Sequence, residues 1–323
     1  MRQVSAPGPR LITLGETMVL VTPALAEPLA EAAEVRLEIG GAESNVAMHA
    51  AALGVPTAWI SAIGDDALGL RLLRTVTAAG VDTRWVRRDP TAPTGVYFKD
   101  PGRGVLYYRR GSAASRLGPE SIVDLPLERA EIVHLSGITP ALSTTCASLI
   151  DRVIDRVTGG ASSDRAFSDR AFSDRALSDR ALSDGHRAIL SFDVNHRAVL
   201  WPPGAAAPAL LTLARRADLV FVGLDEASAL FGCDSAAAVR ELLPQPGTVV
   251  VKDGGIGATE FSATGTTFVP AIPTEVVEAV GAGDAFAAGY LAALLGGADT
   301  EERLRAGHER AQLVLQSTSD LGS

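Results

Sequence analysis

The sequence predicts an α/β fold in which helices cover both faces of a parallel β-sheet and a small second sheet is attached. From about residue 130 onward, short apolar runs typical of buried strands alternate with longer helix-forming segments. Such alternation is typical of a parallel sheet, because the crossover between two parallel strands is usually a helix. Residues 84–111 instead gather β-forming residues, including three of the four tyrosines, around turn signals at Pro93 and 100–104. This segment predicts the small sheet.

The expected elements follow one another along the chain. The first strand, at residues 10–15, is followed by short strands and loops over 17–39. After Gly40 and Gly41, good helix formers predict a helix that stops at Gly54. The other expected strands are 57–63, 132–136, 188–194, 219–222 and 249–252, and the other expected helices are 67–79, 143–157, 207–216, 225–231 and 235–243.

The composition limits the class of protein. A chain of 323 residues that is 47% hydrophobic and 21% charged fits one large α/β domain with an accessory piece. Its net charge of −9 argues against nucleic acid or an anionic membrane as a partner. A small anionic substrate is still compatible, because a single pocket can be positive on an acidic protein.

The two cysteines, Cys146 and Cys233, show neither metal-ligand spacing nor a disulfide framework. We interpret them as small buried residues of a protein in a reducing compartment. No apolar signal segment precedes Gly15, and the longest apolar run, residues 285–298, is shorter than the ~18 residues that a membrane span needs. We therefore expect a cytoplasmic protein.

Residues 163–184 form a low-complexity repeat, with Ser-Asp-Arg-Ala-Phe twice and then Ser-Asp-Arg-Ala-Leu twice. Five helical residues advance by ~500°, so the Phe and Leu positions trace no single helix face. We expect a slipped duplication that forms a mobile insertion, not a binding site.

The strongest motif is the segment 280–290, Val-Gly-Ala-Gly-Asp-Ala-Phe-Ala-Ala-Gly-Tyr. Its glycines allow a tight turn into an apolar helix, and a helix N-terminus carries about half a positive charge that suits phosphate oxygens. Asp284, just inside that helix, is placed to accept a proton beside a bound anion. For this motif alone, an ordinary glycine-rich loop with Asp284 as a capping residue is the alternative.

A second motif is Gly40-Gly41-Ala-Glu-Ser-Asn45. Its two glycines allow a ligand to approach the backbone closely, and Asn45 offers both a donor and an acceptor to a hydroxyl group. Taken alone, this motif is more simply interpreted as a strand-to-helix turn.

Together the two motifs resemble the two signatures of the PfkB (ribokinase-like) family of carbohydrate kinases, over about residues 10–318. Four further segments, in the same order, are similar to the kinases of 2-keto-3-deoxygluconate (2-dehydro-3-deoxygluconokinases) within this family. These segments are Gly95-Val-Tyr97, Tyr107-Tyr-Arg109-Arg-Gly-Ser-Ala113, His134-Leu-Ser-Gly-Ile-Thr-Pro-Ala-Leu-Ser143, and Asp193-Val-Asn-His-Arg197 with Trp201.

The resemblance implies a ribokinase-like three-layer α/β/α sandwich, formed by residues 10–16, 41–83 and 112–318. A β-sheet lid, formed by residues 17–40 and 84–111, would cover the sugar and exclude water that would otherwise hydrolyse ATP. Exposed lid strands commonly need a partner edge, so we expect a homo-oligomer that assembles through them.

The resemblance also implies roles in the reaction. Asp284 would take the proton from the sugar's primary hydroxyl, and the amides of Ala282, Gly283 and Asp284, after Gly281, would hold the transferring phosphoryl group. The implied substrate contacts are Gly40, Gly41, Asn45, Tyr97, Tyr107, Arg109, Arg197 and Asp284.

Two arginines would select an acidic sugar. Arg109 and Arg197 would bind the acid group, because a planar guanidinium matches a carboxylate through two parallel hydrogen bonds. Tyr97 and Tyr107 would contact the hydroxyls. Alternatively, Arg109 is an exposed lid arginine and Arg197 forms an ion pair with Asp193.

ATP is the implied second substrate, with Mg²⁺ ordered through water by Glu226. At Gly223 this chain lacks the Asn or Ser that is usual in the family. Residues 278–280, Glu-Ala-Val, replace the usual Asp-Thr or Asp-Pro, which leaves a monovalent cation as a possibility. The implied ATP contacts are Asp193, Asn195, Glu226, Lys252, Gly254, Gly257, Gly281 and Gly283.

The chain ends soon after Asp320, earlier than is typical of the family. Part of the wall on the adenine side is therefore expected to be missing. His308 lies in the segment that usually lines this wall, and we interpret it as a surface residue of a helix.

The resemblance thus implies ATP-dependent phosphorylation of the terminal hydroxyl of 2-keto-3-deoxygluconate or a closely related sugar acid. A kinase of neutral sugars, of the fructokinase or ribokinase type, is the first alternative. A non-catalytic pseudo-kinase that binds sugar or nucleotide is the second, but such a binder would have no use for a proton acceptor at the phosphate site.

Overall fold

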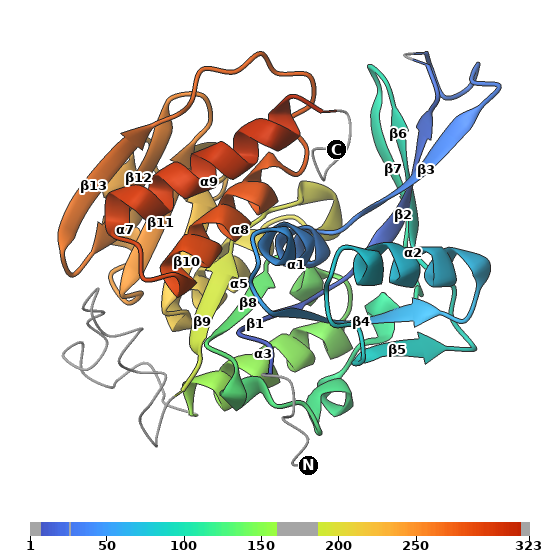
Figure 1. The fold of residues 1–323 in the computed structure, drawn as a ribbon, viewed down its shortest axis with the longest axis horizontal. Helices are drawn as coiled ribbons and strands as arrows, with labels where there is room; N and C mark the ends of the chain where they lie inside the picture. Colours follow the sequence, from blue (N-terminus) through green and yellow to red (C-terminus); the bar gives the residue numbers. More distant parts are fainter. Residues whose placement is uncertain (1–7, 26, 160–186, 318–323) are drawn as a thin grey trace, which may run out of the picture.

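A large nine-stranded sheet forms the middle layer of the protein (Figure 1). The computed structural model describes residues 8–25, 27–159 and 187–317; the predicted insertion at 163–184 lies outside them. The sheet has the order β13-β12-β11-β10-β9-β8-β1-β4-β5. Its strands are β1 (Leu11–Leu14), β4 (Thr57–Gly64), β5 (Val86–Asp89), β8 (Ile132–Ser136), β9 (Ile189–Asp193), β10 (Leu219–Gly223), β11 (Thr248–Asp253), β12 (Gly257–Ser262) and β13 (Gly265–Pro270).

From β5 to β11 the neighbouring strands are parallel, as the alternating pattern predicts. The pairs β11·β12 and β12·β13 are antiparallel, which the sequence analysis did not anticipate. The reason is the length of the connections: β12 ends at Ser262 and β13 begins at Gly265. Such a short link makes a hairpin, whereas a parallel pair needs a crossover of a dozen or more residues.

Helices cover both faces of this sheet, which completes the predicted three layers. One apolar core lies between the sheet and α3, α5, α6 and α7, and two further clusters lie beneath α1, α2, α8 and α9. The helices are α1 (Ala42–Ala52), α2 (Ala67–Ala78), α3 (Thr144–Thr158), α5 (Ala206–Arg216), α6 (Leu224–Phe231), α7 (Ala236–Leu242), α8 (Ala282–Leu295) and α9 (Thr300–Leu315).

Helix α3 shows how local sequence defines an element. The hydroxyl of Ser143 accepts a hydrogen bond from the amide of Cys146, and Gly159 ends the helix in the left-handed conformation with φ 73°. Its buried residues recur at intervals of three or four, which places them on one face against the sheet. They are Cys146, Leu149, Ile150, Val153, Ile154 and Val157.

A separate four-stranded sheet projects from the large one near α2, with the order β3-β2-β6-β7 (Figure 1). Its strands are β2 (Met18–Pro23), β3 (Val35–Gly40), β6 (Val96–Asp100) and β7 (Gly104–Tyr108). One predicted boundary is wrong: the range 84–111 includes β5, which pairs with β4 in the large sheet. Strand β5 follows the crossover helix α2, so it continues the parallel sheet.

A buried polar cluster ties α8 and α9 to β12. The Tyr290 hydroxyl donates to Glu260 Oε2 over 2.6 Å, and Arg303 Nη2 donates to Glu260 Oε1 over 2.9 Å. Glu260 is fully buried, so its charge needs the stabilisation that these partners provide.

Replacing Glu260 with alanine is expected to lower the free energy of unfolding by about 3–5 kcal/mol, because Arg303 then loses its buried counter-charge. Urea denaturation measures the change. The matched control is Glu301→Ala on α9, whose ion pair with Arg305 is exposed and contributes at most about 0.5 kcal/mol. Equal losses for the two variants would contradict the assignment of Glu260 as a buried anchor.

Candidate active site

A cavity of about 990 Å³ lies where the two sheets meet. It is lined by the ends of β3, β9, β10 and β11, by the starts of α1 and α8, and by the small sheet. Ligands of parallel α/β sheets usually bind at this carboxyl edge. The volume is sufficient for two small molecules side by side.

Asp284 is the point at which three distant segments meet. Asn45 Nδ2, on the first turn of α1, donates to Asp284 Oδ2 over 2.9 Å. Asn195 Nδ2, in the loop after β9, lies 3.3 Å from Asp284 Oδ1. Asn195 holds an unusual left-handed backbone with φ 37°, so this loop is constrained where it contacts Asp284. Both predicted motifs therefore belong to one site.

Burial raises the pKa of Asp284 to about 7, and the nearby Asp193 carboxylate adds to the rise. The hydrogen bond from Asn45 and the positive charges of Arg197 and Lys252 act in the opposite direction. A carboxyl group with such a pKa can gain or lose a proton near neutral pH, as a general base must.

The start of α8 offers backbone donors beside Asp284. Gly281 adopts φ 86°, a left-handed conformation that favours glycine and turns the chain into the helix. In the described part of the chain, the amides of Gly283 and Asp284 have no hydrogen-bond partner, whereas the amide of Ala282 donates to the Ala279 carbonyl over 3.3 Å. Two of the three predicted donors are thus open to an anion.

Lys252 lies beside this helix start. A Cβ atom added to Gly283 would be 3.4 Å from Lys252 Nζ, and Nζ donates to Asp193 Oδ2 over 2.8 Å. Burial lowers the pKa of Lys252, but the carboxylates of Asp193 and Glu226 outweigh burial and raise it overall. The ammonium group therefore stays charged.

Glu226 is held by the backbone at the same end of the cavity. Its Oε1 accepts from the His196 amide over 2.8 Å and its Oε2 from the Gly223 amide over 3.0 Å. Gly223 and Lys252 occupy the same register in the parallel strands β10 and β11. The lysine thus stands next to Gly223, a position without a polar side chain.

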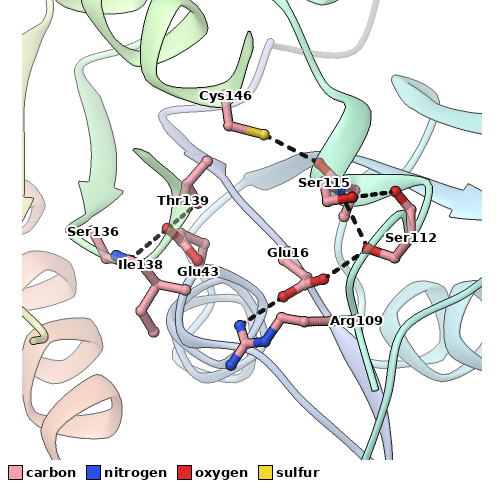
Figure 2. A network of polar contacts seen from close by, with 10 residues as sticks. Glu16, Glu43, Arg109, Ser112, Ser115, Ser136, Ile138, Thr139 and Cys146 are labelled. Atoms are coloured by element: carbon pink, nitrogen blue, oxygen red, sulfur yellow. Dashed lines mark hydrogen bonds and ion pairs between the residues drawn. The ribbon is translucent and has the colours of Figure 1, made fainter. Parts of the chain in front are cut away.

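Arg109 is buried, in contrast to the alternative of an exposed lid arginine. Its Nη1 donates to Glu16 Oε2 over 2.8 Å (Figure 2). Its guanidinium lies 4.3 Å from the centre of the Tyr107 ring. Sequence analysis missed Glu16. A charged residue directly after the first strand was the available signal, because that position lies at the carboxyl edge of the sheet.

Arg197 also lines the cavity but is exposed. It donates to the carbonyl of His196 over 3.0 Å. The alternative of an ion pair with Asp193 does not describe this structure, since Asp193 is paired with Lys252.

A second acidic residue, Glu43, was also missed. Its Oε1 accepts hydrogen bonds from the hydroxyls of Ser136 and Thr139 (Figure 2), while its Oε2 is buried without a partner among the described residues. Burial raises the pKa of Glu43 to about 7. This carboxyl group fastens the start of α1 to the loop after β8 and so supports Asn45.

Helix α9 forms one wall of the cavity, from the segment for which the sequence analysis expected a partly missing wall. His308, Ala311, Gln312 and Leu315 all line the cavity. The interpretation of His308 as a surface residue is wrong: its Nε2 lies 3.1 Å from the Val269 carbonyl, and its ring packs edge-on against Phe286. The predicted Gly254 and Gly257 line the cavity as well.

Three further observations concern the cysteines, the helices and the metal-ligating side chains of the described residues. Both cysteines are free and buried, as predicted. No helix among the described residues is both long and apolar enough to span a membrane. Within the same residues, no three or more His, Cys, Asp or Glu side chains are grouped to hold a metal ion directly.

Residues 9–182 and 168–322 match the pfkB family of carbohydrate kinases. The chain belongs to this family. This carbohydrate kinase is 30% identical to a 2-dehydro-3-deoxygluconokinase of Thermoproteus tenax, in an alignment that covers 96% of this chain and 89% of the relative. It is also 30% identical to a 2-dehydro-3-deoxygalactonokinase of Haloferax volcanii, with 96% and 92% covered.

The fold of the carbohydrate kinase is ribokinase-like. The crystal structure of a putative ribokinase II from E. coli, in complex with ATP and Mg²⁺, aligns with a TM-score of 0.82 at 21% identity. The alignment covers 97% of this chain and 94% of that one. The predicted three-layer sandwich with a smaller sheet is thereby confirmed.

Proposed function

We propose that this carbohydrate kinase transfers the γ-phosphoryl group of ATP to the terminal hydroxyl of 2-keto-3-deoxygluconate or a closely related sugar acid. The observation that carries the proposal is the meeting of Asp284 with the open amides at the start of α8, in a cavity that also contains Arg109 and Arg197. Relatives named for 2-dehydro-3-deoxygluconate and 2-dehydro-3-deoxygalactonate support an acidic sugar.

In the proposed reaction, Asp284 accepts the proton of the sugar hydroxyl as that oxygen attacks the γ-phosphorus. The bond from the γ-phosphorus to the β,γ-bridging oxygen breaks, and ADP leaves. The amides of Gly283 and Asp284 donate to the transferring phosphoryl group, and the Lys252 ammonium offsets its negative charge. Asp193 holds Lys252 in place. Asn45 and Asn195 orient the Asp284 carboxylate.

ATP occupies the part of the cavity next to α9 in this proposal, where Gly254 and Gly257 allow the nucleotide to approach the backbone. A structural neighbour holds ATP with Mg²⁺. Both carboxylate oxygens of Glu226 accept hydrogen bonds from backbone amides. In this proposal the carboxylate would therefore hold Mg²⁺ through a water molecule and not by direct coordination. The ion would neutralise phosphate charge. A monovalent cation near residues 278–280 stays a prediction, as does a cytoplasmic location.

The sugar end is proposed to lie beneath the small sheet, which would serve as a lid. Tyr97 and Tyr107 stack there with ring centres 5.8 Å apart and offer hydroxyls to the substrate. The guanidinium groups of Arg109 and Arg197 would bind the carboxylate. Gly40 and Gly41 permit close approach of the sugar to the backbone.

A neutral-sugar kinase is the second candidate, and one observation favours it. The charge of Arg109 is already balanced by Glu16, which reduces the attraction for an anionic substrate. A coupled assay of ADP release with keto-deoxy sugar acids, fructose and ribose decides between the two candidates. A kcat/KM for fructose or ribose equal to that for the acids would overturn the choice of an acidic substrate.

Asp284→Asn is expected to reduce kcat by at least ~10²-fold, because positioned proton transfer contributes ~10²–10⁴-fold. ATP affinity and the melting temperature are expected to change little, and both are measured as controls. In the unsubstituted enzyme, kcat should rise as the pH passes through about 7, since only ionised Asp284 accepts a proton. A variant that retains more than a tenth of the kcat would remove Asp284 from this role.

Arg109→Ala is expected to raise the KM for a keto-deoxy acid by ~10-fold or more, because a charge-assisted contact contributes ~1.5–3 kcal/mol. The KM for ATP should stay within about twofold of the original value, since no ATP contact is proposed for Arg109. The matched control is Arg110→Ala, the exposed neighbour on the same segment. Equal effects on both KM values would count against the assignment.

We further propose that the carbohydrate kinase self-associates through the small sheet. Strands β3 and β7 are its open edges, and Val35, Leu106 and Tyr108 expose apolar surface there. Light scattering should give at least twice the mass of one chain, and Tyr108→Glu should shift that mass toward one chain. A single-chain mass for the unsubstituted protein would contradict this proposal.

A further inference from the structure

Four connections between the two sheets pass close to Glu16. Glu16 itself lies between β1 and β2, Arg109 follows β7, Gly41 precedes α1, and Gly95 precedes β6. A Cβ atom added to Gly41 would lie 2.3 Å from the Glu16 carbonyl oxygen, and one added to Gly95 would lie 3.2 Å from Glu16 Oε1. Gly41 therefore allows close packing against the Glu16 backbone, and Gly95 allows close packing against the Glu16 carboxylate.

The Glu16 side chain is enclosed and fully engaged. Only 3% of the residue is exposed. One carboxylate oxygen accepts from Arg109 Nη1 over 2.8 Å, and the other accepts from the Ser112 hydroxyl over 3.1 Å (Figure 2). Ser112 in turn accepts from the amide of Ser115, so the carboxylate is linked to the core beyond the small sheet.

Arg109 uses little of its hydrogen-bonding capacity in this arrangement. A guanidinium has five N–H donors; Nη1 serves Glu16, and Nε is buried without a partner among the described residues. Tyr107 covers one face of the group. The guanidinium is thus fixed in direction while donors remain for a ligand in the cavity that it lines.

We propose that Glu16 is a positioning residue that holds the Arg109 guanidinium ready for the carboxylate of an acidic sugar. This inference rests on the proposed function. A side chain that is ordered before binding does not lose its conformational freedom when the substrate arrives. The ion pair also removes the cost of keeping Arg109 buried and unbalanced before the substrate binds. Glu16 therefore acts on sugar affinity through Arg109, not on ATP or on the chemical step.

A double-mutant cycle tests the proposal with the variants Glu16→Ala, Arg109→Ala and the two combined. Glu16→Ala should raise the KM for the sugar acid by ~10-fold, the scale of a charge-assisted contact, with kcat and the KM for ATP within about twofold. In the Arg109→Ala background, the same change should raise the KM by less than about twofold. Glu16→Gln, which keeps an acceptor for Nη1, should restore much of the affinity.

A second cycle with Glu16→Asp covers the case in which Glu16→Ala does not fold. The shorter carboxylate keeps the buried charge but cannot reach Arg109 and Ser112 together. Glu16→Asp should therefore raise the KM for the sugar acid in the original enzyme but not in the Arg109→Ala variant. The inference would be overturned if the Glu16 substitutions raised the KM for the sugar acid equally with and without Arg109→Ala. It would also be overturned if they changed the KM for the sugar acid and the KM for ATP equally, because Glu16 would then have only a structural role. An enzyme that phosphorylates no sugar acid would instead overturn the proposed function, and the inference with it.

Discussion

The hydrogen bond from Asn45 to Asp284 is the contact on which the site depends. It joins the first turns of α1 and α8, whose bonded residues are 239 positions apart in the chain. Each of these helices starts after a glycine, Gly41 or Gly281. The loop after β9 lies at the carboxyl edge of the parallel strands, whereas α1 begins where β3 of the small sheet ends and α8 begins after the segment that follows β13. All three line one cavity.

Local charge pairing explains how an acidic chain can serve anionic ligands. The net charge is −9, yet the cavity contains the cations Lys252 and Arg109, each fixed by its own carboxylate. These pairs lower the cost of burying a cation and hold it in one direction. In the proposed function these cations act on a ligand at short range, so the overall charge of the protein has little influence on recognition.

The small sheet and the large sheet are linked through the residues that surround Glu16. Residues of β6 and β7 line the cavity, while the connections back to the large sheet pack around Glu16. The two glycines at this crossing leave no room for a side chain. A movement of the small sheet would therefore change the position of Arg109, which directly follows β7.

Local patterns in the chain were enough to define the α/β class, most strands and helices, and the two glycine motifs around Asn45 and Asp284. These features depend on neighbours in sequence: apolar runs, helix caps and glycines at turns. The hairpin β12–β13, the placement of β5, and the partners of Arg109 and Lys252 were decided only by the assembled fold. The choice of partner for a buried charge depends on strand order and register, which bring Glu16 and Arg109 together across 93 positions of sequence.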